Sequence, residues 1–309
     1  MNDLQTQINK YLQFCQYQKR LDEKTLKAYR IDLHQFCIAV SNAELCEITA
    51  AVLEDFIAGL HKQYKPKTVK RKIASLKALF RYFEYKEMIE QNPFHKIQVK
   101  FREPVMLPKT IPLRTVEKFL CVIYKEHENA VSDYKKQTTL RDIAVIELLF
   151  ATGMRISELC CLKASDVDLL DKNILIYGKG SKERKIQIGN NDVILILDEY
   201  RMTFADKINE CGYFFVNQAG RPLSDQSVRR MIHKYTASAA IEMHITPHMF
   251  RHTFATSLLE ADVDIRYIQE MLGHSSINIT EIYTHVAMEK QRDILVTKHP
   301  RKDFHISKV

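Results

Sequence analysis

The first third of the chain has the apolar pattern of a helical bundle. Apolar side chains recur there at spacings of three and four residues, which predicts four or five helices and no strand. Three of these helices are expected at residues 3–19, 22–40 and 67–88, the last ending before Asn92-Pro93. This part of the chain is therefore predicted to be all-helical.

The second part is predicted to be mainly helical around one small sheet. Residues 173–177 and 184–188 are rich in β-branched and other apolar residues and flank a glycine-containing turn, which predicts a hairpin. A third strand is expected near 167–169. The periodicity of the short apolar run 213–216 does not show whether this run is a helix or a strand. Helices are expected at 224–240, 247–260 and 264–272, and a shorter one from about residue 276.

Prolines mark a joint between these two parts. Three of the eight prolines fall within 104–112, a segment without helical periodicity that should be extended. At 309 residues the chain is also longer than one hydrophobic core usually supports. We therefore predict a helical N-terminal domain at 1–100, a linker at 101–112 and a C-terminal domain at 113–309.

Composition narrows the class of protein. With 46% hydrophobic and 27% charged residues the chain is neither disordered nor fibrous. No stretch approaches the roughly 18 consecutive apolar residues of a membrane span, and the first residues lack a signal segment, so a cytoplasmic location is expected. The seven cysteines include no C-x-x-C pair, which argues against a disulfide framework and a structural zinc site.

Positive charge is concentrated in one segment. Residues 61–102 contain twelve Lys or Arg and three Glu, a net charge of +9, so the rest of the chain accounts for −1 of the total +8. Such a run is either a solvated helix face or a surface for a phosphate backbone. The candidates for phosphate binding are the basic residues at its centre: Lys65, Lys67, Lys70, Arg71 and Lys72.

Glycine is scarce, at eight residues, and several glycines stand beside basic or imidazole groups. Arg155 follows Gly153 and is expected in the first turn of a new helix, where a cation opposes the helix dipole. Either an anion binds there, shared by Arg155 and backbone N–H groups, or Arg155 pairs with Glu158. Lys179 stands between two glycines at the hairpin tip, as a solvated charge or as a group that swings into a site.

A second cluster lies at the start of the helix predicted at 247–260. Thr246-Pro247 is a good helix start, so His248, Arg251 and His252 share one stripe of the helix. The spacing of the histidines is that of H-E-x-x-H, but Met249 replaces the glutamate and an arginine separates the two ligands. A metal site is therefore not expected.

The last motif follows the helix predicted at 264–272. Gly273 ends that helix, His274 lies in the junction, and Tyr283 comes about two turns further on. The motifs occur along the chain in this order: Arg155, Lys179, His248-x-x-Arg251, Gly273-His274 and Tyr283. Together they resemble the tyrosine recombinase (phage integrase) family, in particular its Xer-type and simple integrase-like members. The similarity spans the whole chain, with Phe250 where the family usually has leucine.

The resemblance implies a mainly α fold, with a SAM-like N-terminal DNA-binding domain and a mostly α catalytic domain that has a small antiparallel sheet. It also implies that Tyr283 attacks a DNA phosphate to give a 3′-phosphotyrosine, and that recombination proceeds through a Holliday junction. Arg155 and Arg251 would hold the phosphate, and His274 would donate a further hydrogen bond to it. His248 would assist proton removal from Tyr283, and Lys179 would protonate the departing 5′-oxygen. No metal, ATP or other cofactor is needed.

By the same resemblance, the partner is double-stranded DNA with specific recombination sites. A homo-tetramer, or a pair of recombinases, would act on two sites in the nucleoid. The helix at 224–240 would enter the major groove, and its basic residues there are Arg229, Arg230 and Lys234; a merely solvated helix is the alternative. A catalytically silent DNA-binding protein and a type IB topoisomerase stay open as other functions. The sequence does not distinguish chromosome-dimer resolution, integration or excision of an element, and inversion.

Overall fold

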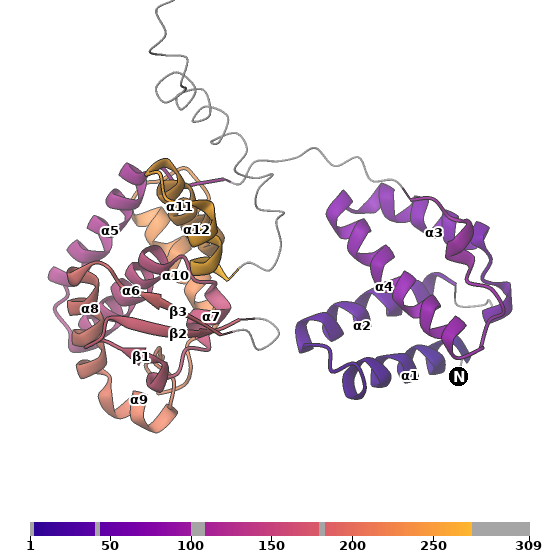
Figure 1. Cartoon of the computed structure of the whole chain (residues 1–309), viewed down its shortest axis with the longest axis horizontal. Coiled ribbons are helices and arrows are strands. Elements are labelled where there is room, and N and C mark those ends of the chain that lie inside the picture. The colour runs from indigo at the N-terminus through magenta and orange to yellow at the C-terminus, as the bar shows by residue number, and fades with distance from the viewer. Residues whose placement is uncertain (1–2, 41–43, 100–108, 179–182, 274–309) are drawn as a thin grey trace, which may run out of the picture. The chain divides into compact units, whose positions relative to one another are not determined.

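The computed structural model of the chain describes residues 3–40, 44–99, 109–178 and 183–273. Most of the predicted linker, the helix predicted from residue 276, and three catalytic candidates, Lys179, His274 and Tyr283, lie outside these residues. The chain divides into two compact units, 1–105 and 106–309 (Figure 1). Each unit has a hydrophobic core of its own. The mainly α fold with one small antiparallel sheet is confirmed.

The first unit is helical throughout its described residues. Its elements in chain order are α1 (Asp3–Tyr17), α2 (Glu23–Ala39), the 3₁₀ turn η1 (Leu45–Glu47), α3 (Ala50–Gln63), α4 (Pro66–Tyr85) and the 3₁₀ turn η2 (Pro93–Lys96). Pro66 stands at the first position of α4, where its missing N–H is no loss. The helix ends three residues before the predicted 88, because Glu87 has a φ of 55°, which no α-helix accommodates.

The second unit surrounds a helix that is buried on most sides. Its helices are α5 (Leu113–Glu128), α6 (Asp133–Thr152), α7 (Ile156–Cys160), α8 (Asn191–Thr203), α9 (Ala205–Cys211), α10 (Asp225–Ser238), α11 (Pro247–Glu260) and α12 (Ile265–Leu272), with the 3₁₀ turn η3 (Ala164–Asp166) before the sheet. The apolar run 143–149 in α6 is buried almost continuously, because α5, α8 and α11 all pack against this helix. The helices predicted at 224–240, 247–260 and 264–272 are confirmed as α10, α11 and α12.

The sheet has the predicted hairpin and third strand. Its strands are β1 (Val167–Asp168), β2 (Asn173–Tyr177) and β3 (Glu183–Gln187), antiparallel in the order β1-β2-β3. Ile174 faces Ile186 in the register, and both side chains are buried. The unassigned run 213–216 makes only isolated bridges, at Tyr213 and Val216, and contributes buried aromatic rings to the core.

Among the described residues, no helix is long and apolar enough to cross a membrane.

Candidate active site and nucleic-acid interface

A tight turn joins α6 to α7 and carries the first catalytic candidate. Gly153 ends α6 with a φ of 59°, a left-handed conformation in which glycine avoids the steric cost of a side chain. A Cβ at this position would lie 2.6 Å from Cδ1 of Phe254 and 2.9 Å from Cδ2 of Leu272. The turn is therefore pressed against α11 and the end of α12, which brings three distant segments of the chain together.

Arg155 lies one position before α7, as its N-cap, and not in the first turn as predicted. Its backbone N–H donates to Oε2 of Glu158 at 2.8 Å, and its Nη1 donates to Oε1 of the same carboxylate at 2.7 Å. The predicted pairing with Glu158 thus forms. Since the Arg155 side chain remains 34% exposed, and a guanidinium has five donors, the pairing still allows Arg155 to bind an anion.

Glu158 pairs with a second arginine, which the sequence analysis did not predict. Arg184 on β3 donates from Nη1 and Nη2 to the two carboxylate oxygens, at 3.0 and 2.7 Å, in a bidentate pair. Burial raises the pKa of Glu158, but the hydrogen bonds from Arg184 and Arg155 outweigh burial and hold this pKa below its usual value. Glu158 is therefore an ionised anchor between two arginines. No local motif marked Arg184, because its partners lie far away in sequence.

Arg251 is buried beside the same turn. Its side chain enters from α11 and donates from Nη1 to the carbonyl of Gly153 at 2.9 Å and from Nη2 to the carbonyl of Leu272 at 2.7 Å. The residue is only 5% exposed. A cation at the last carbonyls of α12 is favourable because these groups have no partner within the helix. Arg251 therefore ties the Gly153 turn to the end of α12.

The two histidines of α11 differ in exposure. His248 lies in the first turn and is exposed, whereas His252 is half-buried one turn later. Burial lowers the pKa of His252, and the charges of His248 and Arg251 lower it further. His252 is thus held in its neutral form over a wider pH range than an exposed histidine.

The described residues bring three of the six catalytic candidates into one part of the second unit: Arg155, His248 and Arg251. The other three lie outside the described residues, but their neighbours in sequence are fixed. Tyr177 pairs with Glu183 at the ends of β2 and β3, and Lys179 lies between these two residues in the sequence. Gly273, with a φ of 64°, caps α12 immediately before His274.

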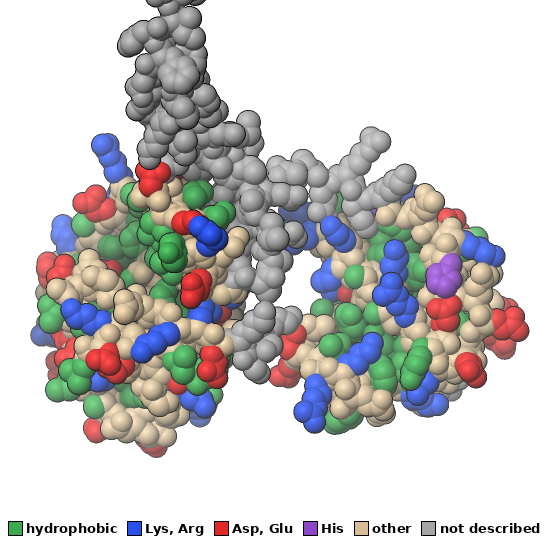
Figure 2. Space-filling model, in the orientation of Figure 1, with side chains coloured by type: hydrophobic (Ala, Val, Ile, Leu, Met, Phe, Trp, Pro, Cys, Tyr) green, Lys and Arg blue, Asp and Glu red, His purple; other side chains and the backbone are tan. Residues whose placement is uncertain are grey.

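The basic surface of the first unit is smaller than predicted. Lys65, Lys67, Lys70 and Arg71 are exposed along the first turns of α4, and Figure 2 shows Lys and Arg side chains interspersed with apolar ones on one face of this unit. The prediction that Lys72 contacts phosphate is wrong, because this residue is only 3% exposed. Its Nζ donates hydrogen bonds to Asp32, at 3.0 Å, and to Gln35. Because a buried charge must be paired, Lys72 stabilises the core and cannot face a phosphate backbone.

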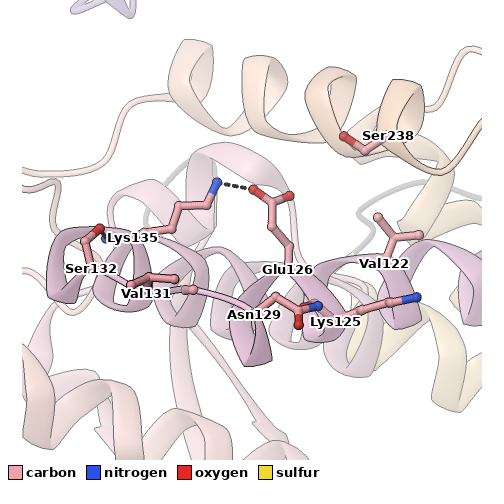
Figure 3. Close-up of a pocket in the computed structure, with 9 residues that line it drawn as sticks. Val122, Lys125, Glu126, Asn129, Val131, Ser132, Lys135 and Ser238 are labelled. Atoms are coloured by element: carbon pink, nitrogen blue, oxygen red, sulfur yellow. Dashed lines mark hydrogen bonds and ion pairs between the residues drawn. The ribbon is translucent and has the colours of Figure 1, made fainter.

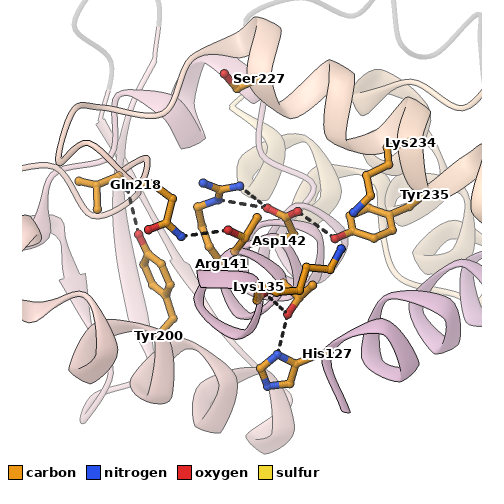
Figure 4. A network of polar contacts seen from close by, with 12 residues as sticks. His127, Lys135, Arg141, Asp142, Tyr200, Gln218, Ser227, Lys234 and Tyr235 are labelled. Atoms are coloured by element: carbon orange, nitrogen blue, oxygen red, sulfur yellow. Dashed lines mark hydrogen bonds and ion pairs between the residues drawn. The ribbon is translucent and has the colours of Figure 1, made fainter. Parts of the chain in front are cut away.

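The second predicted interface is helix α10. A buried acidic residue of α6 holds this helix in place. The hydroxyl of Tyr235 donates to Oδ2 of Asp142 at 2.9 Å, and Arg141 donates to Oδ1 of the same acid from Nε and Nη2, at 3.1 and 2.7 Å (Figure 4). Burial raises the pKa of Asp142, although Arg141 and Tyr235 counteract it. The anchor leaves the opposite face of α10 exposed.

The predicted basic residues of α10 are not equivalent. Arg229 and Arg230 are exposed on the helix. Lys234 donates instead to Oε1 of Glu126 at 2.7 Å, and its Nζ lies 4.2 Å from the ring centre of Tyr235. Part of the charge of Lys234 is therefore already neutralised by the protein.

Two hollows in the described surface lie away from the catalytic candidates. One of about 660 Å³ lies between α5, the start of α6 and α10, where Glu126 pairs with Lys135 (Figure 3). Another of about 550 Å³ lies between α5 and α6 and is lined by Leu120, Tyr124 and Phe150, among others. Arg155, His248 and Arg251 line neither. Within the described ranges, no group of three or more His, Cys, Asp or Glu could hold a metal ion.

The fold and the arrangement of Arg155 and Arg251 agree with one class of enzyme, the tyrosine recombinases. The model of the phage integrase family matches residues 122–290, and that of the phage integrase N-terminal SAM-like domain matches residues 8–86. The chain therefore belongs to the phage integrase family: it is a tyrosine recombinase, an enzyme of DNA strand transfer in site-specific recombination.

Individual relatives agree with this assignment over nearly the whole chain. A protein named tyrosine recombinase from Agathobacter rectalis is 66% identical over 305 residues, covering 99% of this chain and 100% of that protein. The tyrosine recombinase XerD of Listeria innocua serovar 6a is 36% identical, covering 97% and 100%. The crystal structure of the XerH site-specific recombinase bound to palindromic difH substrate, a post-cleavage complex, matches with a TM-score of 0.74 and 25% identity, covering 94% of this chain and 84% of that one.

Proposed function

We propose that this recombinase cuts and rejoins double-stranded DNA at specific sites through a 3′-phosphotyrosine on Tyr283. The Tyr283 oxygen forms a bond to the scissile phosphorus, and the bond from phosphorus to the 5′-oxygen breaks. The reverse reaction with the 5′-hydroxyl of a second strand rejoins the backbone and gives a Holliday junction. One phosphodiester replaces another, so the reaction needs no ATP.

The convergence of Arg155 and Arg251 on the Gly153 turn carries this proposal. Arg155 lies two residues after Gly153, and Arg251 donates a hydrogen bond to the carbonyl of Gly153. Two guanidinium groups on one phosphate offset the charge that develops in the pentacoordinate transition state. Arg251 also donates to the carbonyl of Leu272, and His274, two residues later in the sequence, would donate a further hydrogen bond to the phosphate.

Two groups would move protons. A tyrosine phenol in water has a pKa near 10, so a tyrosine nucleophile needs a base at neutral pH, and exposed His248 is suited to take the proton of Tyr283. Lys179 would give a proton to the departing 5′-oxygen. With two arginines on the phosphate, we expect cleavage to persist in the presence of a metal chelator.

DNA binding would use both units. Lys65, Lys67, Lys70 and Arg71 would contact phosphates, and α10 would enter the major groove with Arg229 and Arg230, helped weakly by Lys234. Arg230→Ala should reduce the preference for the cognate site over random DNA. Lys70→Ala should weaken binding to both DNAs equally and reduce the salt slope by about one. Equal effects of the two variants on both DNAs in a titration by fluorescence anisotropy would contradict this division.

The assembly would contain four protomers, or two pairs of partner recombinases. Exchange between two duplexes requires four strand cleavages, and each chain supplies one Tyr283. We place this reaction in the cytoplasm, on the nucleoid, because that is where such DNA would be found. Cross-linking on DNA that carries the site should give tetramers.

The decisive experiment traps the covalent intermediate. The full-length protein is incubated with genomic fragments, and the DNA that stays attached after denaturation is sequenced to define the site. A nicked duplex with this site, which loses its 5′-hydroxyl strand on cleavage, then accumulates the adduct. Wild-type protein should form it and Tyr283→Phe should not. Adduct formation by Tyr283→Phe at the wild-type rate would refute the assignment, and relaxation of plasmids without the site would favour a topoisomerase.

A further inference from the structure

Arg184 is a buried arginine that the catalytic scheme above does not use. It is the second residue of β3, and its side chain is 8% exposed. Three of its nitrogens donate hydrogen bonds: Nη1 and Nη2 to the carboxylate of Glu158, and Nε to the carbonyl of Met271 at 2.8 Å. A buried side chain with this many specific contacts fixes the relative position of the segments that it joins.

Those segments carry or adjoin three of the catalytic candidates. Glu158 is the partner of Arg155, and Met271 lies three residues before His274 on the segment that leads to Tyr283. β3 begins at Glu183, four residues after Lys179 in the sequence. We propose that Arg184 is a positioning residue, which holds the end of α12 and the Arg155 turn in one register while leaving the charge of Arg155 available to the scissile phosphate. This inference rests on the proposed function.

The charge balance supports the second part of the proposal. Glu158 is buried, and with Arg155 as its only partner the two charges would cancel. With Arg184 also bonded to it, the cluster of two arginines and one glutamate has a net charge of +1. The buried Arg184 then matches the buried carboxylate, and the surplus resides on Arg155, the more exposed of the two arginines. Without Arg184, Glu158 would compete with the DNA phosphate for Arg155.

Gly273 provides a second, independent test of the same contact. A Cβ on Gly273 would lie 3.0 Å from Cδ and 3.0 Å from Nη1 of Arg184, so the arginine packs directly over the glycine that caps α12. Gly212 caps α9 with a similar φ of 76°, but a Cβ there would meet nothing within 4 Å. Replacing either glycine by alanine imposes the same kind of backbone strain, whereas only the alanine at 273 displaces Arg184.

The experiment measures adduct formation on the nicked duplex carrying the trapped site. Arg184→Met should form the adduct at least about tenfold more slowly than wild type, and Arg184→Lys should lie between, since lysine keeps the charge but loses the bidentate geometry. Duplex affinity should change less than about twofold, because Arg184 is buried. Arg201→Met, which breaks an exposed ion pair with Asp198, is the control and should match wild type. Gly273→Ala should be slower than Gly212→Ala.

A substrate with an uncharged scissile group shows whether Arg184→Met misplaces the positive charge of Arg155 or simply disrupts the fold. With a methylphosphonate at the scissile position, the deficit of Arg184→Met relative to wild type should shrink, because less positive charge is needed. Equal deficits on both substrates, or adduct formation within about twofold of wild type, would overturn the inference. If wild-type protein itself forms no adduct, the proposed function fails first; wild-type cleavage with unaffected Arg184 variants refutes this inference alone.

Discussion

Each unit of the chain contains a buried acid held by two basic side chains. The two clusters differ in which segments of the chain supply these basic side chains. In the first unit Asp32 on α2 bonds to Arg71, Lys72 and Ser75, all from neighbouring turns of α4. In the second unit Glu158 bonds to Arg155 and Arg184, which come from a turn and a strand 29 residues apart in sequence. One cluster joins two helices, and the other joins segments around the proposed active site.

The comparison shows that buried ion pairs alone do not mark a functional site. The Asp32 cluster includes a lysine whose charge lies wholly inside the protein, so its effect is on stability. The Glu158 cluster has a surplus arginine that is partly exposed next to a second arginine-bound turn. Each cluster has one partly exposed arginine, Arg71 or Arg155, so exposure does not separate them. The Glu158 cluster differs in that its two arginines come from a turn and a strand, next to a turn that a further arginine holds.

The largest expected effect is on the stability of the first unit. Asp32→Asn leaves Lys72 buried without its counter-ion and should cost about 3–5 kcal/mol in the free energy of unfolding, measured in urea. The double variant with Lys72→Met should recover much of this loss, because an apolar side chain needs no counter-ion. Adduct formation per folded molecule should stay at the wild-type level; a loss of cleavage in the recovered double variant would give the Asp32 cluster a catalytic role.

A matched pair of substitutions separates the two clusters next. Arg71→Gln and Arg155→Gln each remove the more exposed cation of a cluster, and each should change the free energy of unfolding by less than about 1 kcal/mol. Cleavage should fall about 10²- to 10³-fold for Arg155→Gln, because a phosphate ligand is lost. Arg71→Gln should cleave bound DNA normally. Similar cleavage rates for the two variants would contradict the assignment of a catalytic role to the Glu158 cluster and a structural role to the Asp32 cluster.

Glycine substitutions test how closely other atoms pack around the backbone in each unit. Gly153→Ala should destabilise the protein by about 1–3 kcal/mol, since it combines a left-handed backbone with a contact of 2.6 Å to Phe254. Gly59→Ala, inside α3 with nothing within 4 Å of the added Cβ, should instead stabilise by about 0.4–1 kcal/mol. Thermal unfolding followed by circular dichroism distinguishes the two signs, and a stabilising Gly153→Ala would show that the turn tolerates a side chain.

The smallest effect is a pH dependence confined to the second unit. The pKa of His252 is lowered in the folded protein, so below its ordinary value of 6.5 the unfolded chain binds the proton more readily. The free energy of unfolding should therefore decline as the pH falls from 6.5 through the lowered pKa. His252→Gln should reduce this decline in urea titrations kept above about pH 5, where Glu158 stays ionised. An unchanged pH profile would contradict the assignment to His252.

Local pattern was sufficient for most of the elements. The start of α11 follows from Thr246 and Pro247, and the β2–β3 hairpin follows from two β-rich runs around a glycine-containing segment. The family followed from the order of short motifs, each of which can be identified within a few residues. These features depend on neighbours in sequence, which is why they could be predicted without coordinates.

The partners of charged side chains were decided only by the tertiary structure. Lys72 and Lys70 look alike in the sequence, yet one is buried against Asp32 and the other is exposed. Arg184 has no distinguishing motif, and its importance appears only when β3 packs beside α7 and the end of α12. A charge acts through whatever lies within a few ångströms of it, and in a folded chain those atoms come from residues far apart in sequence.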